Sequence, residues 1–149
     1  MEERFYSVKA FAELTGVTER TLRYYDRIHL LKPSRYTEQG HRQYGFNEIY
    51  QIQRIVTLKY LGYSLTEIKE LLAMTKNESF QETLIRQKEM LPKKREEMDY
   101  VIQTIEKVEG LLGDKTLDSD ILLVLIHSFQ HEQDHKKVFL RYNIKASVS

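Results

Sequence analysis

The sequence predicts a mainly α-helical chain in which a winged helix-turn-helix precedes a long coiled-coil helix and a short C-terminal helix. Three observations predict this fold class. Two prolines and six glycines in 149 residues leave few helix breakers. In the first half, two pairs of short amphipathic segments flank a polar hairpin signal. In the second half, apolar residues recur every seven positions.

The first helix pair is expected near the N-terminus. Ser7 is a helix-capping residue type, and Gly16 can adopt the left-handed conformation that ends a helix. Thr18 is the next cap candidate and opens a second helix through about Asp26, with Leu22 directed to the core. A helix, a short glycine turn and a second helix form the helix-turn-helix pattern, whose second helix enters the major groove of DNA.

A wing and a second helix pair are expected next. Pro33 ends an extended connector, and residues 35–44 read as a β-hairpin turning at Gly40. A hairpin directly after a helix-turn-helix is a wing. Asn47 is predicted to cap the following helix, and the capping box that Ser64 begins opens its partner.

From about residue 79 to 112 the apolar pattern changes to heptads. The predicted dimerisation residues share one seam of this helix and are Leu84, Leu91, Met98, Val101, Ile105, Val108 and Leu112. A helix of this length spans about 50 Å and needs a partner, usually a symmetry mate. Pro92 is predicted to kink or break the helix, and the alternative is that it marks the true start of the helix. Asp118 or Ser119 is expected to cap a final helix.

Charge is unevenly distributed along the chain. The net charge is only +1, but residues 1–76 hold 12 Lys/Arg against 9 Asp/Glu, and residues 20–54 hold seven against three. Tyrosines interleave with these arginines, and both side chains suit phosphate and groove contacts. The predicted DNA contacts are Thr18, Arg20, Thr21, Arg23, Tyr24 and Tyr25 on the second helix, and Tyr36, Arg42 and Tyr44 on the hairpin. The alternatives are that Thr18 is only a cap, that Tyr25 is partly core, and that Tyr36 and Tyr44 pack beneath the wing.

Other classes of function receive less support. Cysteine is absent, which excludes disulfides and thiolate metal sites. His127, His131 and His135 have a spacing at which imidazoles can bind Zn²⁺, and Glu132 or Asp134 lie nearby in the sequence, so a metal-binding protein is an alternative. Nothing in the sequence supplies a complete cage, and no metal and no cofactor are predicted. No catalytic constellation is recognisable, so no enzyme is expected. No apolar run exceeds six residues and no signal pattern begins the chain, so no membrane association is expected. A coiled-coil module that binds another protein is a further alternative.

Several motifs, in order and at matching spacing, resemble the MerR family of bacterial transcription regulators. They are the runs Thr21–Asp26, Leu30–Pro33, Gly40–Tyr44 and Leu61–Ile68. The resemblance covers roughly residues 5–112. It is closest to the multidrug-sensor-like branch, through Gln87–Leu91, Met98 and Gln103–Ile105. Members of that branch usually carry a large C-terminal effector domain, whereas only some 35 residues follow the long helix here.

The resemblance implies a cytoplasmic homodimer with antiparallel long helices, each winged unit binding double-stranded promoter DNA. It adds Lys59 as a phosphate contact. It implies a mechanism in which the dimer bends and untwists an over-long promoter spacer for RNA polymerase, in response to a possible small-molecule effector. The implied organisation is a DNA-binding domain over 1–76, a dimerisation helix over 77–113 and a short helical segment over 114–149.

Overall fold

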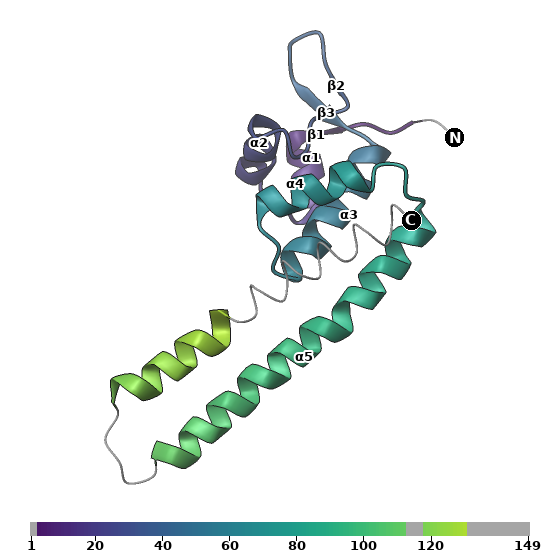
Figure 1. The fold of residues 1–149 in the computed structure, drawn as a ribbon. Coiled ribbons are helices and arrows are strands. Elements are labelled where there is room, and N and C mark those ends of the chain that lie inside the picture. The colour runs from purple at the N-terminus through teal and green to yellow at the C-terminus, as the bar shows by residue number, and fades with distance from the viewer. Residues whose placement is uncertain (1–2, 113–117, 131–149) are drawn as a thin grey trace. The chain divides into compact units, whose positions relative to one another are not determined.

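The computed structural model describes residues 3–112 and 118–130 and is mainly helical, which confirms the predicted fold class (Figure 1). Its elements are β1 (Tyr6–Ser7), α1 (Val8–Thr15), α2 (Glu19–Arg27), β2 (Arg35–Tyr36), β3 (Arg42–Tyr44), α3 (Phe46–Tyr60), α4 (Leu65–Met74) and α5 (Phe80–Leu112). Residues 119–130 form a further helix. The chain divides into two compact units, one ending at Glu70 and the other beginning at Leu71.

The first helix pair forms as predicted. Ser7 Oγ accepts a hydrogen bond from the Ala10 amide at 3.1 Å and caps α1. Gly16 ends this helix at φ 75°, and its amide donates to the Ala12 carbonyl. Thr18 Oγ1 then accepts from the Thr21 amide at 3.1 Å and caps α2. Because each cap satisfies a backbone group that the helix itself leaves unpaired, the turn between α1 and α2 is specified locally.

The C-terminal end of α2 is fixed by a residue in the left-handed conformation and by a lysine from another helix. His29 has φ 60°, and the Leu30 amide donates to the Tyr25 carbonyl at 2.8 Å. Lys69 on α4 donates from Nζ to the Ile28 carbonyl at 3.1 Å. A cation at this end of a helix is favourable because the helix dipole is negative there.

Replacing His29 with Gly is expected to stabilise the fold. A side chain at positive φ costs about 1–2 kcal/mol, and the extra freedom of glycine in the unfolded chain offsets part of the gain. We expect the free energy of unfolding to rise by about 0.5 kcal/mol in urea denaturation. The control is Gly16→Ala at φ 75°, where a Cβ meets no atom within 4 Å. This variant should lose stability, and a loss in both variants would contradict the explanation.

A three-stranded antiparallel sheet has the order β1-β3-β2. The predicted hairpin is confirmed, with Tyr36 opposite Arg42. The third strand, β1, was not predicted, and it pairs Tyr6 with Tyr44. Two residues that precede α1 therefore anchor the base of the wing to the start of the chain.

The second helix pair forms with one corrected cap. Gly45, and not Asn47, is the N-cap of α3, and its amide donates to Glu48 Oε2 at 2.9 Å. A Cβ on Gly45 would lie 3.2 Å from the Phe5 ring, so the close approach of that ring favours glycine at this position. The prediction for Asn47 is wrong because it relied on the preferred capping residue type. The Gly45 amide is instead satisfied by the side chain of Glu48, three residues after Gly45. Ser64 caps α4 as predicted, accepting from the Glu67 amide at 3.1 Å.

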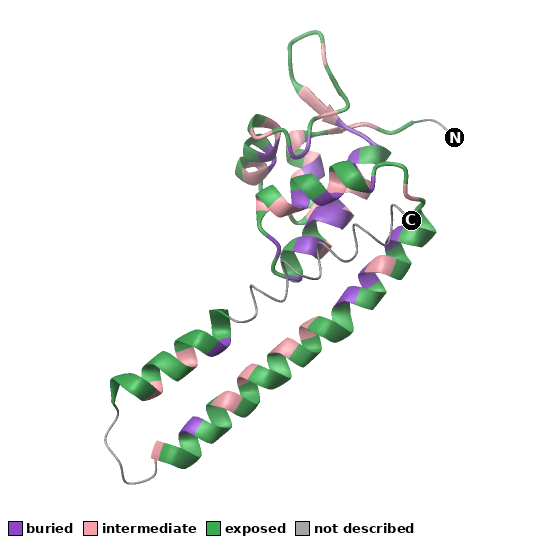
Figure 2. Cartoon of the chain, viewed as in Figure 1, coloured by how far each residue is buried: buried purple, intermediate pink, exposed green. Residues whose placement is uncertain are grey.

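The core of the first unit takes one fully buried side chain from each of its main elements. These are Phe11 of α1, Leu22 of α2, Tyr44 of β3, Ile55 of α3 and Ile68 of α4. Figure 2 shows the buried positions gathered on the facing sides of these helices. The Phe11 and Tyr44 rings stack with centroids 4.6 Å apart, which joins the helix-turn-helix to the wing.

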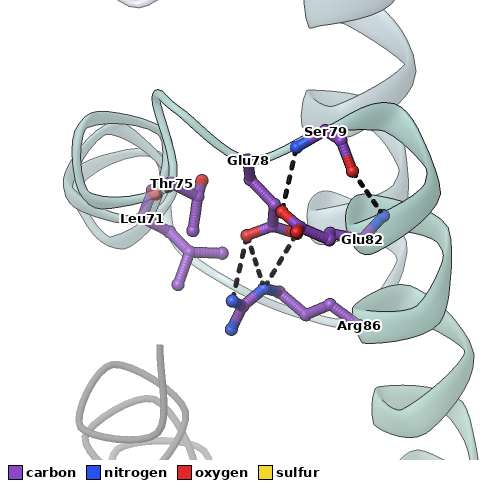
Figure 3. A network of polar contacts seen from close by, with 6 residues as sticks. All are labelled: Leu71, Thr75, Glu78, Ser79, Glu82 and Arg86. Atoms are coloured by element: carbon purple, nitrogen blue, oxygen red, sulfur yellow. Dashed lines mark hydrogen bonds and ion pairs between the residues drawn. The ribbon is translucent and has the colours of Figure 1, made fainter. Parts of the chain in front are cut away.

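A polar network fixes the connection between the end of α4 and the start of α5 (Figure 3). Arg86 forms an ion pair with Glu78 at 2.9 Å, and its Nε donates to both Glu78 oxygens. Ser79 and Glu82 cap the start of α5 reciprocally, each side chain accepting from the amide of the other residue. The Glu78 amide donates to the Thr75 carbonyl. The network therefore caps the start of α5 and holds it to the residues that directly precede it.

The long helix runs through Pro92. α5 is a continuous helix of 33 residues with Pro92 inside it, so the predictions that Pro92 breaks the helix or marks its start are wrong, and a kink at Pro92 stays a prediction. One missing amide removes a single hydrogen bond among many, and the flanking turns stay helical. The helix over 119–130 is capped as predicted, with the Ile121 amide donating to Asp118 Oδ1 at 3.0 Å. Within residues 3–112 and 118–130, no helix is long and apolar enough to cross a bilayer.

Candidate nucleic-acid interface

The second helix of the helix-turn-helix, α2, has one buried face and one exposed cationic face. Leu22 and Tyr25 are directed into the core. Arg20, Arg23 and Tyr24 are exposed on the other side. The three-residue spacing of Leu22 and Tyr25 keeps both on one face, so the arginines are held outward by the packing of their neighbours.

Two threonines occupy the first turn of α2. The hydroxyl of Thr18 hydrogen bonds to that of Thr21 at 2.8 Å while it caps the helix. The alternative that Thr18 acts as a cap is confirmed, and a role in DNA contact stays a prediction for both residues. Amides in a first turn favour an anion, so the capped end of α2 suits a phosphate.

The wing carries its own exposed side chains. Tyr36 on β2 is exposed, and its strand neighbour Arg35 donates from Nε to Gln43 Oε1 at 2.9 Å. The Arg35 guanidinium lies over the Phe5 ring at 3.5 Å, a cation–π contact. Arg35 was not among the predicted site residues, and Phe5 lies far from it in sequence, so no local pattern indicated their contact.

An ion pair connects α2 with the wing. Arg42 Nε on β3 donates to Asp26 Oδ2 on α2 at 2.8 Å. This hydrogen bond raises the pKa of Arg42 above its ordinary value. Asp26 is an acidic residue in the basic window and was not predicted as a site residue. Its partner is 16 positions away, so the sequence held no signal for the pairing.

Tyr25 and Tyr44 were predicted as DNA contacts, and their burial confirms the alternatives that Tyr25 belongs to the core and that Tyr44 packs beneath the wing. Their exposed fractions are 4% and 0%. Burial raises the pKa of each phenol. The physical reason is that the Tyr44 ring stacks on Phe11 of α1, and that Tyr25 shares the buried face of α2 with Leu22.

Replacing Tyr44 with Phe is expected to preserve the fold and to improve its alkaline stability. Among the described residues, the buried Tyr44 hydroxyl has no hydrogen-bond partner, so its removal costs little. Because the pKa of Tyr44 is raised in the folded state, its contribution to the free energy of unfolding is fully present below the ordinary pKa of 10.0. This contribution is lost as the pH rises above that value. Each such phenol contributes a slope of about 1.4 kcal/mol per pH unit. Urea denaturation between pH 8 and 11 should show a shallower loss for Tyr44→Phe, and an unchanged slope would contradict this.

The remaining predicted residues lie in several places. Lys59 is exposed on α3. Of the predicted seam on α5, Leu84, Leu91, Met98 and Ile105 are exposed, whereas Val101 and Leu112 are half-buried and Val108 is buried within the chain. Val108 is therefore already covered without a partner chain. His127 is exposed in the helix over 119–130, and His131 and His135 lie outside the described residues.

Comparisons with known proteins agree with this geometry. The family model described as MerR HTH family regulatory protein matches residues 6–75, and the model described as MerR, DNA binding matches residues 49–114. The HTH-type transcriptional activator mta of Bacillus subtilis is 44% identical over 135 residues, which are 90% of this chain and 52% of that protein. The chain thus spans about half the length of the curated relatives that it matches.

Two solved structures share the fold. The N-terminus of Mta, the Bacillus subtilis multidrug transporter activator, is 44% identical, with a TM-score of 0.52 over 72% of this chain and 98% of that one. A MerR-family transcriptional regulator from Bacillus cereus is 31% identical, with a TM-score of 0.53 over 87% of this chain and 99% of that one. The similarity to Mta agrees with the predicted branch. On its sequence and its fold, the chain belongs to the MerR family of helix-turn-helix regulatory proteins.

Proposed function

We propose that the protein is a transcription regulator that binds double-stranded promoter DNA through α2 and the wing. The observation that carries this proposal is the division of α2 into a core face and a face of exposed Arg20, Arg23 and Tyr24. A helix anchored on one side can enter the major groove, where arginine recognises guanine edges or grips phosphates. Tyr36, Arg42 and Lys59 would contact the backbone beside the groove.

The proposal includes a homodimer formed by α5. Leu84, Leu91, Met98 and Ile105 are exposed at seven-residue intervals, a spacing that suits an antiparallel pairing with a second copy. We assign residues 1–76 to DNA binding and 77–113 to dimerisation. The segment 114–149 receives no function.

We further propose the mode of action that is typical of the family. The dimer would bend and untwist an over-long promoter spacer so that RNA polymerase meets both promoter elements on one face. A small-molecule effector would shift the population between inactive and DNA-twisting states. Such a regulator works in the cytoplasm, and the proposal assigns it no catalytic step, no cofactor and no metal.

The test is DNA affinity as a function of salt for Arg23→Ala. Fluorescence anisotropy with a labelled promoter duplex should show affinity that falls steeply as salt rises, because bound phosphates release counterions. Arg23→Ala should weaken binding about tenfold or more. Arg95→Ala, the same change at an exposed position of α5, is the control and should bind like the native protein. Binding that is undetectable or independent of salt in the native protein would reject the proposal.

A further inference from the structure

Asp26 presents a contradiction within the proposed DNA-binding surface. It lies on α2 between Arg23 and Arg27, both of which are exposed. DNA carries closely spaced phosphates, so a carboxylate on this helix is expected to repel it. An acid at this place needs a favourable contact that outweighs the repulsion.

The contact is with the Arg42 guanidinium of the wing. Asp26 Oδ2 accepts from Arg42 Nε at 2.8 Å, and the exposed fractions of the two side chains are 12% for Asp26 and 35% for Arg42. The carboxylate is thus mostly shielded from solvent, and the arginine is only partly so. Contact through Nε occupies one edge of the guanidinium and leaves the two terminal nitrogens as donors. Among the described residues, no ion pair or hydrogen bond engages those nitrogens.

The ion pair is formed beyond the anchored base of the wing. The base of the wing is held by the stack of Tyr44 on Phe11 and by the pairing of β3 with β1. Arg42 lies just beyond the part of β3 that pairs with β1, and it is opposite the exposed Tyr36. Asp26 therefore ties the part of the wing beyond its anchored base to the helix that is proposed to enter the groove.

We propose that Asp26 is a positioning residue for DNA binding. It holds Arg42 by the Nε edge, so that the free nitrogens are directed to a phosphate and the wing stays in register with α2. This inference rests on the proposed function, because it assumes that α2 and the wing bind the same duplex. If this is so, removing the negative charge of Asp26 weakens DNA binding, whereas electrostatic repulsion alone predicts that its removal strengthens binding.

The test compares Asp26→Ala, Arg42→Gln and the double variant by fluorescence anisotropy on one promoter duplex. Glu38→Ala is the matched control, because Glu38 is an exposed acid of the wing loop. Electrostatics alone predicts that both acid-to-alanine variants bind more tightly. We expect Glu38→Ala to bind as tightly as the native protein or more tightly, and Asp26→Ala to bind about fivefold more weakly, the scale of one ordered ion pair.

The double variant and the salt dependence separate positioning from a general loss of structure. We expect the double variant to bind like Arg42→Gln alone, because Asp26 acts through Arg42. The slope of log affinity against log salt should fall by about 0.9 in Arg42→Gln, the value of one lost phosphate contact. Urea denaturation should show the Asp26→Ala protein still folded, and Asp26→Asn, which keeps an acceptor oxygen, should recover part of the affinity.

Two results would overturn the inference. One is Asp26→Ala binding as tightly as the native protein or more tightly, and the other is losses that add fully in the double variant. Failure of the native protein to bind any duplex would instead reject the proposed function. The two failures are therefore distinguishable.

Discussion

Replacing Met98 with Glu is expected to convert the protein from a dimer to a monomer and to weaken DNA binding about 100-fold. Met98 is 47% exposed in the single chain, and Leu91, one heptad earlier, is 44% exposed. Met98 lies near the middle of α5. In the proposed antiparallel pair, the two introduced carboxylates would therefore face each other across the interface, where burial without a partner is costly. Separation of the two DNA-binding units removes an avidity of about 10²–10⁴.

Sedimentation velocity and anisotropy check this expectation together. Gln103→Glu places the same charge on another exposed face of α5, five positions further on, and should stay dimeric with native affinity. A native protein that is monomeric in solution would favour the alternative of a coiled-coil module for another protein. A Met98→Glu variant that stays dimeric would show that a different surface forms the dimer.

Replacing Phe11 with Ala is expected to lower the free energy of unfolding by about 3–5 kcal/mol, which is a large part of the stability of a small unit. Phe11 is 0% exposed, and its ring stacks on Tyr44 at 4.6 Å. Truncation leaves a cavity between α1 and the wing and removes the stacking contact. DNA binding should be lost with the fold, because α2 and the wing share this core.

Leu14→Ala is the matched control on the same helix. Leu14 is 56% exposed, so its truncation removes little buried area and should change the free energy of unfolding by less than about 0.5 kcal/mol. Urea denaturation followed by circular dichroism measures both variants. Equal losses would contradict the assignment of Phe11 to the core.

Features of the fold that depend on neighbours in sequence could be predicted from the sequence. The caps at Ser7, Thr18 and Ser64 depend on a hydroxyl that meets an amide three residues later, and all three form. The left-handed Gly16 and the two ends of α5 follow from equally local rules, whereas the break predicted at Pro92 does not form. For the same reason, the order of the helices and the position of the wing were predictable.

Features that depend on distant segments could not be predicted. The strand β1 exists because Tyr6 meets Tyr44, and glycine is favoured at position 45 because the ring of Phe5, forty residues earlier in the sequence, lies close to it. The ion pair of Asp26 with Arg42 joins α2 to β3 in the same way. Periodicity identifies an apolar face but does not show which tyrosines fill the core, so the sequence left open whether Tyr44 contacts DNA or packs beneath the wing.

Hydroxyl-radical footprinting of the DNA upstream of the gene for this protein tests the central claim most directly. A homodimer with two winged units should protect two segments related by two-fold symmetry, with centres about one helical turn, or a multiple of it, apart. Protection should disappear as the salt concentration rises. A single protected segment at saturating protein would contradict the dimer. No protection at any protein concentration, on this region or on other promoter DNA, would contradict DNA binding itself.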